Sequence, residues 1–269
     1  MTDVLLPILL NAHNPGPMTG AGNNTYLLAS SGAAVLIDAG VGHPDHLDGI
    51  DRTLSDNALR LRAVLVTHDH PDHVSGAPAI ARAHPRARFA KYRWPDGGPQ
   101  YGLEWHSLRD GDEVGFGDEV LTAVHSPGHA PDHLAFWHEP DRALFTGDLV
   151  MAGGGVMIQA SRGGNLARYL ESLQRMLDLD PRHLFPAHGP RVDDPRALIG
   201  ACLEHRRMRE RQVVAALEAG QQTVEAIAES IYDGLGPALM AAARENVRAH
   251  LEKLRDEGTA AERDGWWTL

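Results

Sequence analysis

The chain has 269 residues, of which 43% are hydrophobic, so it is long enough to bury a substantial core. It carries 36 acidic residues against 25 basic ones, for a formal net charge of −11 at pH 7. This charge repels polyanions, which argues against a high-affinity, non-specific nucleic-acid binder and against stable binding of double-stranded DNA. The single cysteine excludes an internal disulfide and a cysteine-rich zinc site. Any metal site must therefore be built from nitrogen and oxygen ligands.

The first apolar run, residues 4–10, is too short to span a bilayer. It also lacks the basic flank and the small-residue cleavage site of a signal peptide. We expect this run to form a strand, and we expect a cytoplasmic protein with no membrane partner.

Short apolar runs bounded by glycine and proline turns follow, and they are rich in Val, Leu and Phe. This pattern predicts strands at residues 25–29, 33–38, 61–67, 119–125, 133–137, 143–147 and 183–187. Residues 44–59, 72–84 and 165–178 have helical patterns, and leucines recur at helical spacing in the last of these. The alternation of strand-rich and helical stretches predicts an α/β sandwich of layered sheets and helices.

The last quarter of the chain is mostly helical in pattern. Asp194 and Pro195 suit the N-cap and the first residue of a long helix. Thr223 can cap a second helix, and Pro237 can open a third. A hairpin turn signal, Asp264-Gly265, then precedes two tryptophans. Three helices and a hairpin form a winged-helix-like outline, although a helical cap that packs on the main domain fits the same pattern.

The stretch Thr67-His-Asp-His-Pro-Asp-His73 directly follows a predicted strand. His68 and His70 are two residues apart on an extended segment, so their rings leave the same side and can bind one cation. Asp72 and His73 lie at the expected start of a helix and point to a neighbouring position. Burying these groups together without a metal would leave costly unpaired polar atoms. The stretch therefore predicts two cations, with a solvated loop as the alternative.

Further ligand-type residues follow later strands, where an α/β scaffold holds functional groups rigidly. His129 lies in a Pro-Gly turn, Asp148 follows a pair of apolar strands, and His188 follows another strand. His125 and His133 compete with His129 for the same place, but the Pro-Gly turn favours His129.

At these residues the chain resembles the metallo-β-lactamase fold superfamily, whose His-x-His-x-Asp-His signature stands here as His68-Asp-His70-Pro-Asp72-His73. The resemblance covers about residues 5–190 and implies an αββα four-layer sandwich. It also implies how the ligands are shared: His68, His70 and His129 on one metal, Asp72, His73 and His188 on the other, and Asp148 bridging the two.

Residues 14–28 and the segment from Arg206 onward are similar to the lactamase-beta-like protein 2 group. Members of that group carry a winged-helix-like C-terminal region and include metal-dependent endoribonucleases. The resemblance implies a catalytic domain at residues 1–194 and a winged-helix-like helical region at residues 195–269. Because every candidate ligand precedes residue 189, we expect the C-terminal region to form one wall of the substrate entrance and not to build the metal site.

Two metal ions held close together lower the pKa of bound water and stabilise charge on the attacking and leaving oxygens. We therefore expect a dinuclear metal-dependent hydrolase in which a metal-bridging hydroxide is the nucleophile. Asp72 and Asp148 are the expected catalytic residues, with Asp72 orienting the hydroxide as well as binding metal. Zinc is the expected metal because histidine dominates the ligands, and iron and manganese also suit such a site.

Three residues are weaker candidates for substrate contacts. Arg162, in the glycine-rich segment 152–165, can meet an anionic substrate, and a solvated arginine in an ordinary loop is the alternative. The stretch Asn23-Asn24-Thr25, with Asn24 and Thr25 as the named candidates, can offer side-chain donors at the rim of the pocket or shape a turn.

Three function hypotheses follow. The first is a phosphodiesterase or endoribonuclease that acts on single-stranded RNA; the C-terminal resemblance supports it and the acidic charge opposes it. The second is a hydrolase of small-molecule thioesters, lactones or β-lactams, similar to hydroxyacylglutathione hydrolases. The third is a non-catalytic or redox metal protein with a partner-binding C-terminal region. The presence of every hydrolytic ligand counts against the third.

Overall fold

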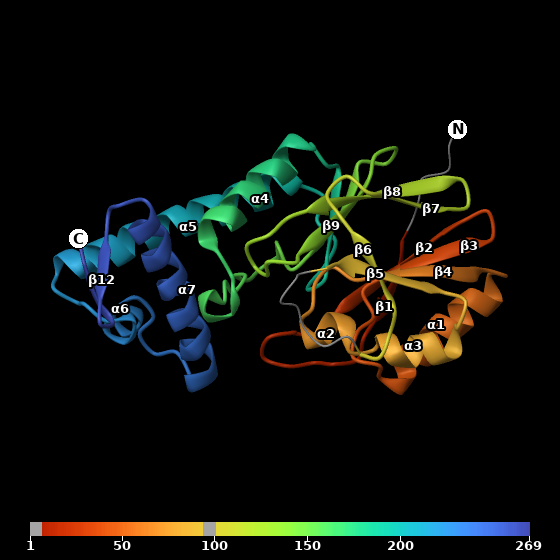
Figure 1. Ribbon diagram of the computed structural model, residues 1–269, viewed down its shortest axis with the longest axis horizontal. Coiled ribbons are helices and arrows are strands. Elements are labelled where there is room, and N and C mark those ends of the chain that lie inside the picture. The colour runs from red at the N-terminus through yellow and green to blue at the C-terminus, as the bar shows by residue number, and fades with distance from the viewer. Residues whose placement is uncertain (1–6, 94–100) are drawn as a thin grey trace.

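The computed structural model describes residues 7–93 and 101–269 (Figure 1). Its strands are β1 (Ile8–Asn11), β2 (Asn24–Ser30), β3 (Ala33–Ile37), β4 (Arg60–Leu65), β5 (Arg88–Tyr92), β6 (Trp105–Leu108), β7 (Glu113–Phe116), β8 (Glu119–His125), β9 (Leu134–His138), β10 (Ala143–Gly147), β11 (His183–Pro186), β12 (Ala261–Arg263) and β13 (Trp266–Thr268). Its helices are α1 (Pro44–Asp56), α2 (Pro71–Val74), α3 (Ala77–Ala83), the short 3-10 helix η1 (Ala160–Arg162), α4 (Leu166–Asp178), α5 (Pro195–Glu218), α6 (Val224–Ile231) and α7 (Pro237–Asp256).

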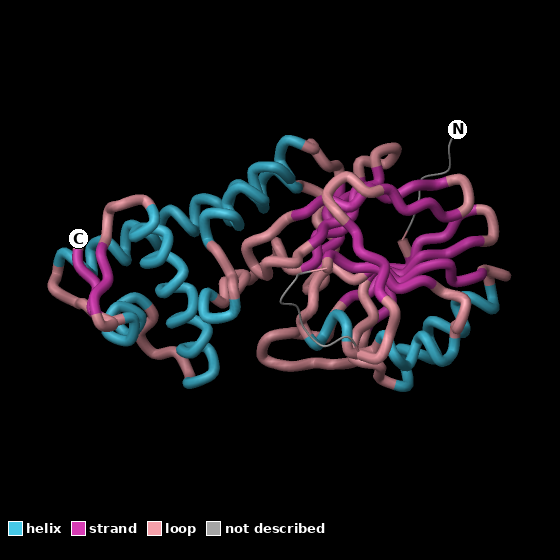
Figure 2. Tube along the Cα trace, viewed as in Figure 1, coloured by secondary structure: helices cyan, strands magenta, loops and turns pink. Residues whose placement is uncertain are grey.

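The strands up to β11 form two stacked sheets. In the first, β1 to β6 lie side by side in chain order, antiparallel from β1 to β3 and parallel from β3 to β6. The second has the order β11-β10-β9-β8-β7 and is antiparallel except for the parallel pair β10–β11. Helices α1 to α3 cover the outer face of the first sheet, and α4 and the start of α5 cover that of the second (Figures 1 and 2). The structure confirms the αββα four-layer sandwich.

Alternating side chains in the strands build these layers. In β2, Tyr26 and Leu28 belong to the core between the sheets, whereas Leu27 packs under helices α1 and α3. Phe136 and Phe145 of the second sheet fill the same inter-sheet core. Successive residues of a strand point to opposite faces, and here both faces are buried, which explains why the strands read as apolar runs.

The predicted helix at residues 72–84 was wrong in one respect, because the structure divides it into α2 and α3. Ser75 and Gly76 separate the two helices. A Cβ atom on Gly76 would collide with the carbonyl oxygen of Ala39, so the loop after β3 approaches this backbone too closely for any side chain. The break therefore packs the loop after β3 against the turn that follows α2.

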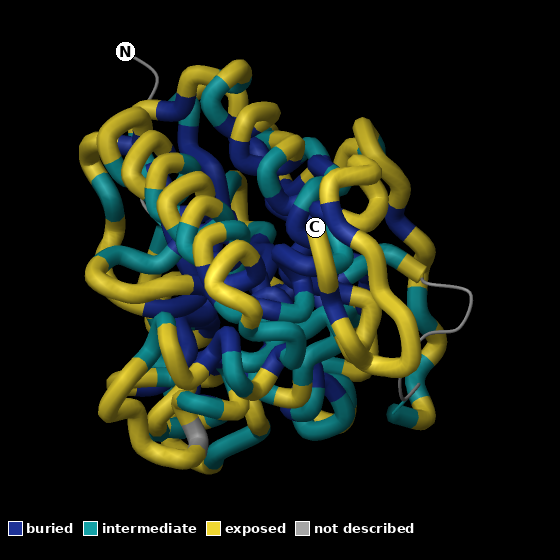
Figure 3. Tube along the Cα trace, turned by 90° about the vertical axis from the view of Figure 1, so that its left-hand side faces the viewer, coloured by how far each residue is buried: buried dark blue, intermediate teal, exposed yellow. Residues whose placement is uncertain are grey.

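Helix α5 joins the sandwich to the C-terminal region. Its first half contributes Ile199 to the core under α4. Its second half contributes Val213 and Leu217 to a separate core formed with α6, α7 and the β12–β13 hairpin. Figure 3, which faces the C-terminal end, shows buried segments beneath an exposed outer surface. The boundary at residue 194 falls just before α5 and stays a prediction.

The C-terminal elements follow the predicted signals. The side chains of Asp194 and Thr223 cap α5 and α6 by accepting hydrogen bonds from the backbone N–H groups of Ala197 and Ala226. Helix α7 begins at Pro237, and the Asp264-Gly265 turn joins β12 to β13.

Strands β5, β6 and β7 were not predicted, because charged or polar residues interrupt their apolar positions. The first predicted strand, residues 4–10, is described only from residue 7, and β1 begins at Ile8. Within residues 7–93 and 101–269, none of the helices is long and apolar enough to cross a membrane.

Candidate metal centre and active site

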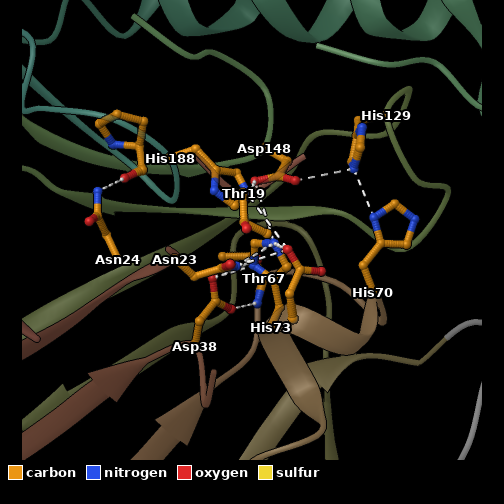
Figure 4. Close-up of polar contacts among 12 residues, drawn as sticks. Thr19, Asn23, Asn24, Asp38, Thr67, His70, His73, His129, Asp148 and His188 are labelled. Atoms are coloured by element: carbon orange, nitrogen blue, oxygen red, sulfur yellow. Dashed lines mark hydrogen bonds and ion pairs between the residues drawn. The ribbon is translucent and has the colours of Figure 1, made fainter. Parts of the chain in front are cut away.

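The ligand-type residues lie where strands of both sheets end. His68, His70, Asp72 and His73 lie on the segment that runs from the end of β4 into α2. The second sheet supplies three more, each after the end of a different strand: His129 after β8, Asp148 after β10 and His188 after β11. The structure therefore brings all seven predicted ligand residues to one edge of the sandwich (Figure 4).

The first group consists of His68, His70, His129 and Asp148, whose ligand atoms lie within 4.8 Å of one another. Nδ1 of His70 is 2.9 Å from Nε2 of His68 and 3.0 Å from Nε2 of His129. Oδ2 of Asp148 is 3.5 Å from Nε2 of His129. Three imidazole nitrogens and one carboxylate oxygen thus face a common point.

The second group consists of Asp72, His73 and His188, also within 4.8 Å of one another. Oδ2 of Asp72 is 3.5 Å from Nε2 of His73 and 3.6 Å from Nε2 of His188. Oδ1 of Asp148 is 3.4 Å from Nε2 of His73 and 3.3 Å from Nε2 of His188. The Asp148 carboxylate therefore lies between the groups, with one oxygen toward each (Figure 4).

Hydrogen bonds donated by the outer ring nitrogens fix the orientation of two histidines. Nδ1 of His129 donates to the backbone oxygen of Met157 at 2.7 Å, and Nδ1 of His73 donates to Oδ2 of Asp38 at 2.8 Å. Each bond leaves the Nε2 lone pair directed at the centre, which is the tautomer that a metal requires. Asp38 also accepts bonds from the N–H and the hydroxyl of Thr67, so it holds the segment that carries the ligands.

Gly128 lets the turn before His129 pack against α4. Its φ of +139° lies in a region that side chains rarely adopt, and a Cβ there would overlap the backbone of Tyr169. The Pro-Gly turn is thus the reason that His129 reaches the centre.

The protonation states of the two groups differ. Burial lowers the pKa of His68 well below its usual value and that of His70 to about 4. Burial acts in the same direction on His188, but the contacts of its ring with Asp148 and Asp72 outweigh it and raise the pKa to about 9. Burial also lowers the pKa of His73, but the charges of Asp148 and Asp38 outweigh it and raise that pKa well above its usual value. In the metal-free protein the neighbouring carboxylates therefore favour the protonated rings of His73 and His188.

The donor set fits divalent metal ions. Oδ1 of Asp148 is buried and has no hydrogen bond among the described residues, and the same is true of Nδ1 of His188. A buried carboxylate oxygen without a donor is unfavourable, whereas a metal ion would satisfy it. Imidazole nitrogens with carboxylate oxygens, and no thiolate, suit zinc, iron or manganese.

Metal binding at pH 7 is expected to release at least about one proton per chain, because a metal binds only the neutral ring of His188. With a pKa of about 9 that ring is protonated at pH 7, whereas the ring of His70, with a pKa of about 4, is already neutral. Metal affinity should therefore rise with pH between pH 7 and about pH 9. Isothermal titration calorimetry in buffers of different ionisation enthalpy measures the protons directly. Binding that releases no proton at pH 7 would contradict this assignment.

The two histidines that compete with His129 lie elsewhere. His125 stacks on Tyr92 with ring centroids 4.1 Å apart and belongs to neither group. His133 is fully buried, and its Nε2 accepts a hydrogen bond from the backbone N–H of Asp148 at 3.1 Å. His133 thus positions the backbone of the residue between the two groups.

The three weaker candidates for substrate contacts differ in position. Arg162 lines the cavity beside the two groups. Asn24 and Thr25 are buried and do not line it. Nδ2 of Asn24 donates to the backbone oxygens of Pro186 and Gly189, and the Thr25 hydroxyl donates to Leu10. We therefore correct the expected rim position of Asn24 and Thr25: their polar atoms hold the turn around His188 and the edge of the first sheet.

Two further polar residues lie at the centre, and neither was among the named candidate site residues. Asn23 donates to Oδ2 of Asp72 at 3.0 Å, and Asp38 holds His73. Asp38 directly follows the apolar strand β3, which is the same signal that identified Asp148 and His188. No comparable pattern distinguishes Asn23 from its neighbours.

The cavity beside the centre has a volume of about 220 Å³. The candidate ligands His70, Asp72, His129, Asp148 and His188 form its floor. Most of its remaining wall is apolar, and three methionines, Met18, Met151 and Met157, contribute to it. Arg162 is the one cationic side chain, histidines apart, among the described residues of this wall.

Comparison with known families agrees with this geometry. Residues 18–188 match the model of the metallo-beta-lactamase superfamily. The chain belongs to the metallo-β-lactamase superfamily. Residues 223–267 match the model of the beta-lactamase associated winged helix domain, so the winged-helix-like outline of the C-terminal region is confirmed. As a member of this superfamily with two His/Asp groups, the protein is a metal-dependent hydrolase.

Individual relatives cover most of the chain. The beta-lactamase-like protein 2 homolog of Caenorhabditis elegans is 30% identical over 96% of this chain and 86% of its own. An atrochrysone carboxyl ACP thioesterase of Aspergillus chevalieri is 34% identical over 82% of this chain and 71% of its own. A metallo-beta-lactamase family protein of Thermus thermophilus, known by crystal structure, shares the fold with a TM-score of 0.79 at 24% identity, over 97% of this chain and 98% of its own.

Proposed function

We propose that this metal-dependent hydrolase cleaves thioesters. The observation that carries the proposal is the wall of the cavity, which is largely apolar and rich in methionine above a polar floor of candidate ligands. Such a wall suits the uncharged acyl part of a thioester, and methionine adapts to substrates of varied shape. The name of the Aspergillus chevalieri relative, a thioesterase, supports the same chemistry.

We further propose the roles of the site residues. His68, His70 and His129 would hold one divalent ion, Asp72, His73 and His188 the other, and Asp148 both; zinc is the first choice for a histidine-rich set. When bound, the ions supply water activation at neutral pH and stabilisation of the negative charge that develops on the substrate carbonyl oxygen.

The chain's own groups prepare the reaction. Burial raises the pKa of Asp72, but the contact with His188 and the charge of His73 outweigh it and hold that pKa below the usual value, so Asp72 is a carboxylate at neutral pH. Its oxygens can accept a hydrogen bond from the attacking water and so orient it. The bond from Asn23 fixes this carboxylate. Arg162 on the cavity wall can meet an anionic group of the substrate.

Single-stranded RNA remains the second candidate substrate, because the winged-helix region lines a second cavity that shares wall residues with the catalytic one. Residues 200–269 contain nine Lys and Arg against twelve Asp and Glu, however, and the cavity wall offers one arginine. A groove for polyanions is usually basic and lined with aromatic rings on which bases stack. These features favour the thioester.

A substrate panel tests the proposal. The metal-loaded protein is given N-acetylcysteamine thioesters, a lactone, a β-lactam, a bis-aryl phosphodiester and single-stranded RNA, with zinc, iron and manganese in turn. We expect the highest kcat/KM on the thioesters, measured by trapping the free thiol. Cleavage of RNA or of the phosphodiester without cleavage of any thioester would replace this proposal by the second candidate.

A further inference from the structure

A second cavity of about 400 Å³ adjoins the catalytic one. The two share the wall residues Met18, Met151, Gly155, Val156 and Met157. The opposite wall of the second cavity comes from α5, α7 and the segment between α6 and α7. We call this cavity the C-terminal pocket.

Two arginines of α5 line the C-terminal pocket. Arg209 stacks on the ring of Tyr232 at 4.3 Å, and its Nη1 donates to Oε1 of Gln212 at 2.8 Å. Arg206 donates to Oδ1 of Asn246 and to the backbone oxygen of Val156. Neither arginine has a carboxylate within ion-pair distance in the part of the chain that the structure describes.

Neighbouring arginines behave differently. On the same helix, Arg207 and Arg211 both pair with Glu204, and Arg244 of α7 pairs with Glu229. Arg206 is also only 4% exposed, and a buried charge without a counter-charge is unfavourable. The pocket therefore presents uncompensated positive charge.

Apart from His205, Tyr232 and Asn246, the other residues that line the C-terminal pocket are apolar. They include Leu239 and Ala243 of α7, Leu235 before it, and the shared methionines. Leu235 and Leu239 are exposed. A ligand that fills the pocket thus needs a largely uncharged arm and a negative group near its end.

The pocket wall is held to the C-terminal region by direct bonds. Besides the bond from Arg206 to the Val156 oxygen, the N–H of Ile158 donates to Oδ1 of Asn246 at 3.0 Å. Met157 lies between Val156 and Ile158, and its backbone oxygen accepts a hydrogen bond from Nδ1 of His129. The segment that lines both cavities is therefore held in place by bonds on either side, and the pocket is formed before any ligand arrives.

We propose that the C-terminal pocket binds the anionic end of an extended substrate whose thioester lies in the catalytic cavity, with Arg209 as the principal contact. This inference rests on the proposed thioesterase function, because a thioester has groups on both sides of its scissile bond and the two cavities adjoin. The negative group belongs either to the thiol, as in a phosphopantetheine arm, or to the far end of the acyl chain. Arg209, which is partly exposed, can offer its fork of N–H donors to phosphate or carboxylate.

The experiment compares three hexanoyl-length substrates of the metal-loaded protein. One is the neutral N-acetylcysteamine thioester, the second is the coenzyme A thioester, and the third is an N-acetylcysteamine thioester whose acyl chain ends in a carboxylate. For Arg209→Gln we expect KM for one anionic substrate to rise about tenfold more than KM for the neutral one. The substrate that is affected identifies the side that carries the charge. Arg211→Gln, on the same helix but paired with Glu204, is the matched control and should change none of the three.

Binding without turnover separates the two proposals. Coenzyme A and adipate are titrated by calorimetry into wild-type protein and into the Arg209→Gln variant. If no thioester is cleaved but one of these anions still binds in a way that Arg209→Gln weakens, the thioesterase function fails while the anion pocket stands. If thioesters are cleaved, and Arg209→Gln and Arg211→Gln have the same KM for every substrate and the same affinity for both anions, the proposed anion site is wrong.

Discussion

Replacing Asp148 by Asn is expected to lower kcat/KM more than about a hundredfold and to reduce the metal content from two ions per chain to at most one. Asp148 turns one oxygen to each group of histidines, and its Oδ1 has no hydrogen bond in the described chain. Asn keeps the shape but supplies one oxygen and no charge. Loss of residues that merely orient metal ligands costs about 10–100-fold, so loss of the shared ligand should cost more. Elemental analysis of protein kept away from chelators gives the metal content.

The matched controls are two histidines of one segment. His129→Ala should remove metal and activity, because its Nε2 faces His70 and Asp148. His125→Ala should retain both, since that ring stacks on Tyr92 outside the groups. If His125→Ala loses metal while His129→Ala keeps it, the assignment of the ligands is wrong. Full activity of Asp148→Asn with one metal or fewer would exclude the dinuclear mechanism.

Replacing Asp38 by Ala is expected to destabilise the metal-free protein by about 3 kcal/mol and to weaken metal binding about 10–100-fold. The Asp38 carboxylate is buried and accepts three hydrogen bonds, two from Thr67 and one from His73. Alanine leaves the buried N–H of Thr67 and Nδ1 of His73 without these acceptors, and the ring of His73 then has no fixed orientation. Urea unfolding measures the stability, and competition with a chelator measures the affinity.

Asp51 provides the control for Asp38, because it is also a carboxylate in contact with a histidine, His84, but at an exposed position. Asp51→Ala is expected to change neither stability nor metal affinity measurably, as exposed ion pairs contribute little. Asp38→Asn, which keeps one acceptor oxygen, should fall between wild type and Asp38→Ala. Equal effects of Asp38→Ala and Asp51→Ala would refute the structural part assigned to Asp38.

The sequence was most informative where one physical requirement decides the residue type. Strands buried on both faces appear as short apolar runs, and turn residues bound them, so β2, β3, β4 and β8 to β11 were predictable. Ligand-type side chains directly after such runs identified the seven residues that the structure gathers. The C-terminal caps were predictable because an N-cap oxygen and a proline at the first helical position act locally.

What escaped prediction depends on contacts between distant segments. The break at Gly76 exists because the loop after β3 approaches it, and the burial of Asn24 follows from its bonds to the turn around His188. Neither partner is near in sequence. The two unpaired arginines of α5 look, in the sequence, like their paired neighbours on the same helix, because only the fold decides which of them faces a carboxylate.

The continuous helix α5 has a consequence for substrate length. Its 24 residues extend about 36 Å without a break, with one end in the core under α4 and the other in the C-terminal core. Backbone hydrogen bonds, and not a hinge, therefore set the separation between Arg209 and the groups that face the scissile bond. With that separation fixed, an arm that is too short leaves its charge in the apolar stretch, and an arm that is too long must fold back. The protein would then select substrates by the distance between their reactive and charged ends.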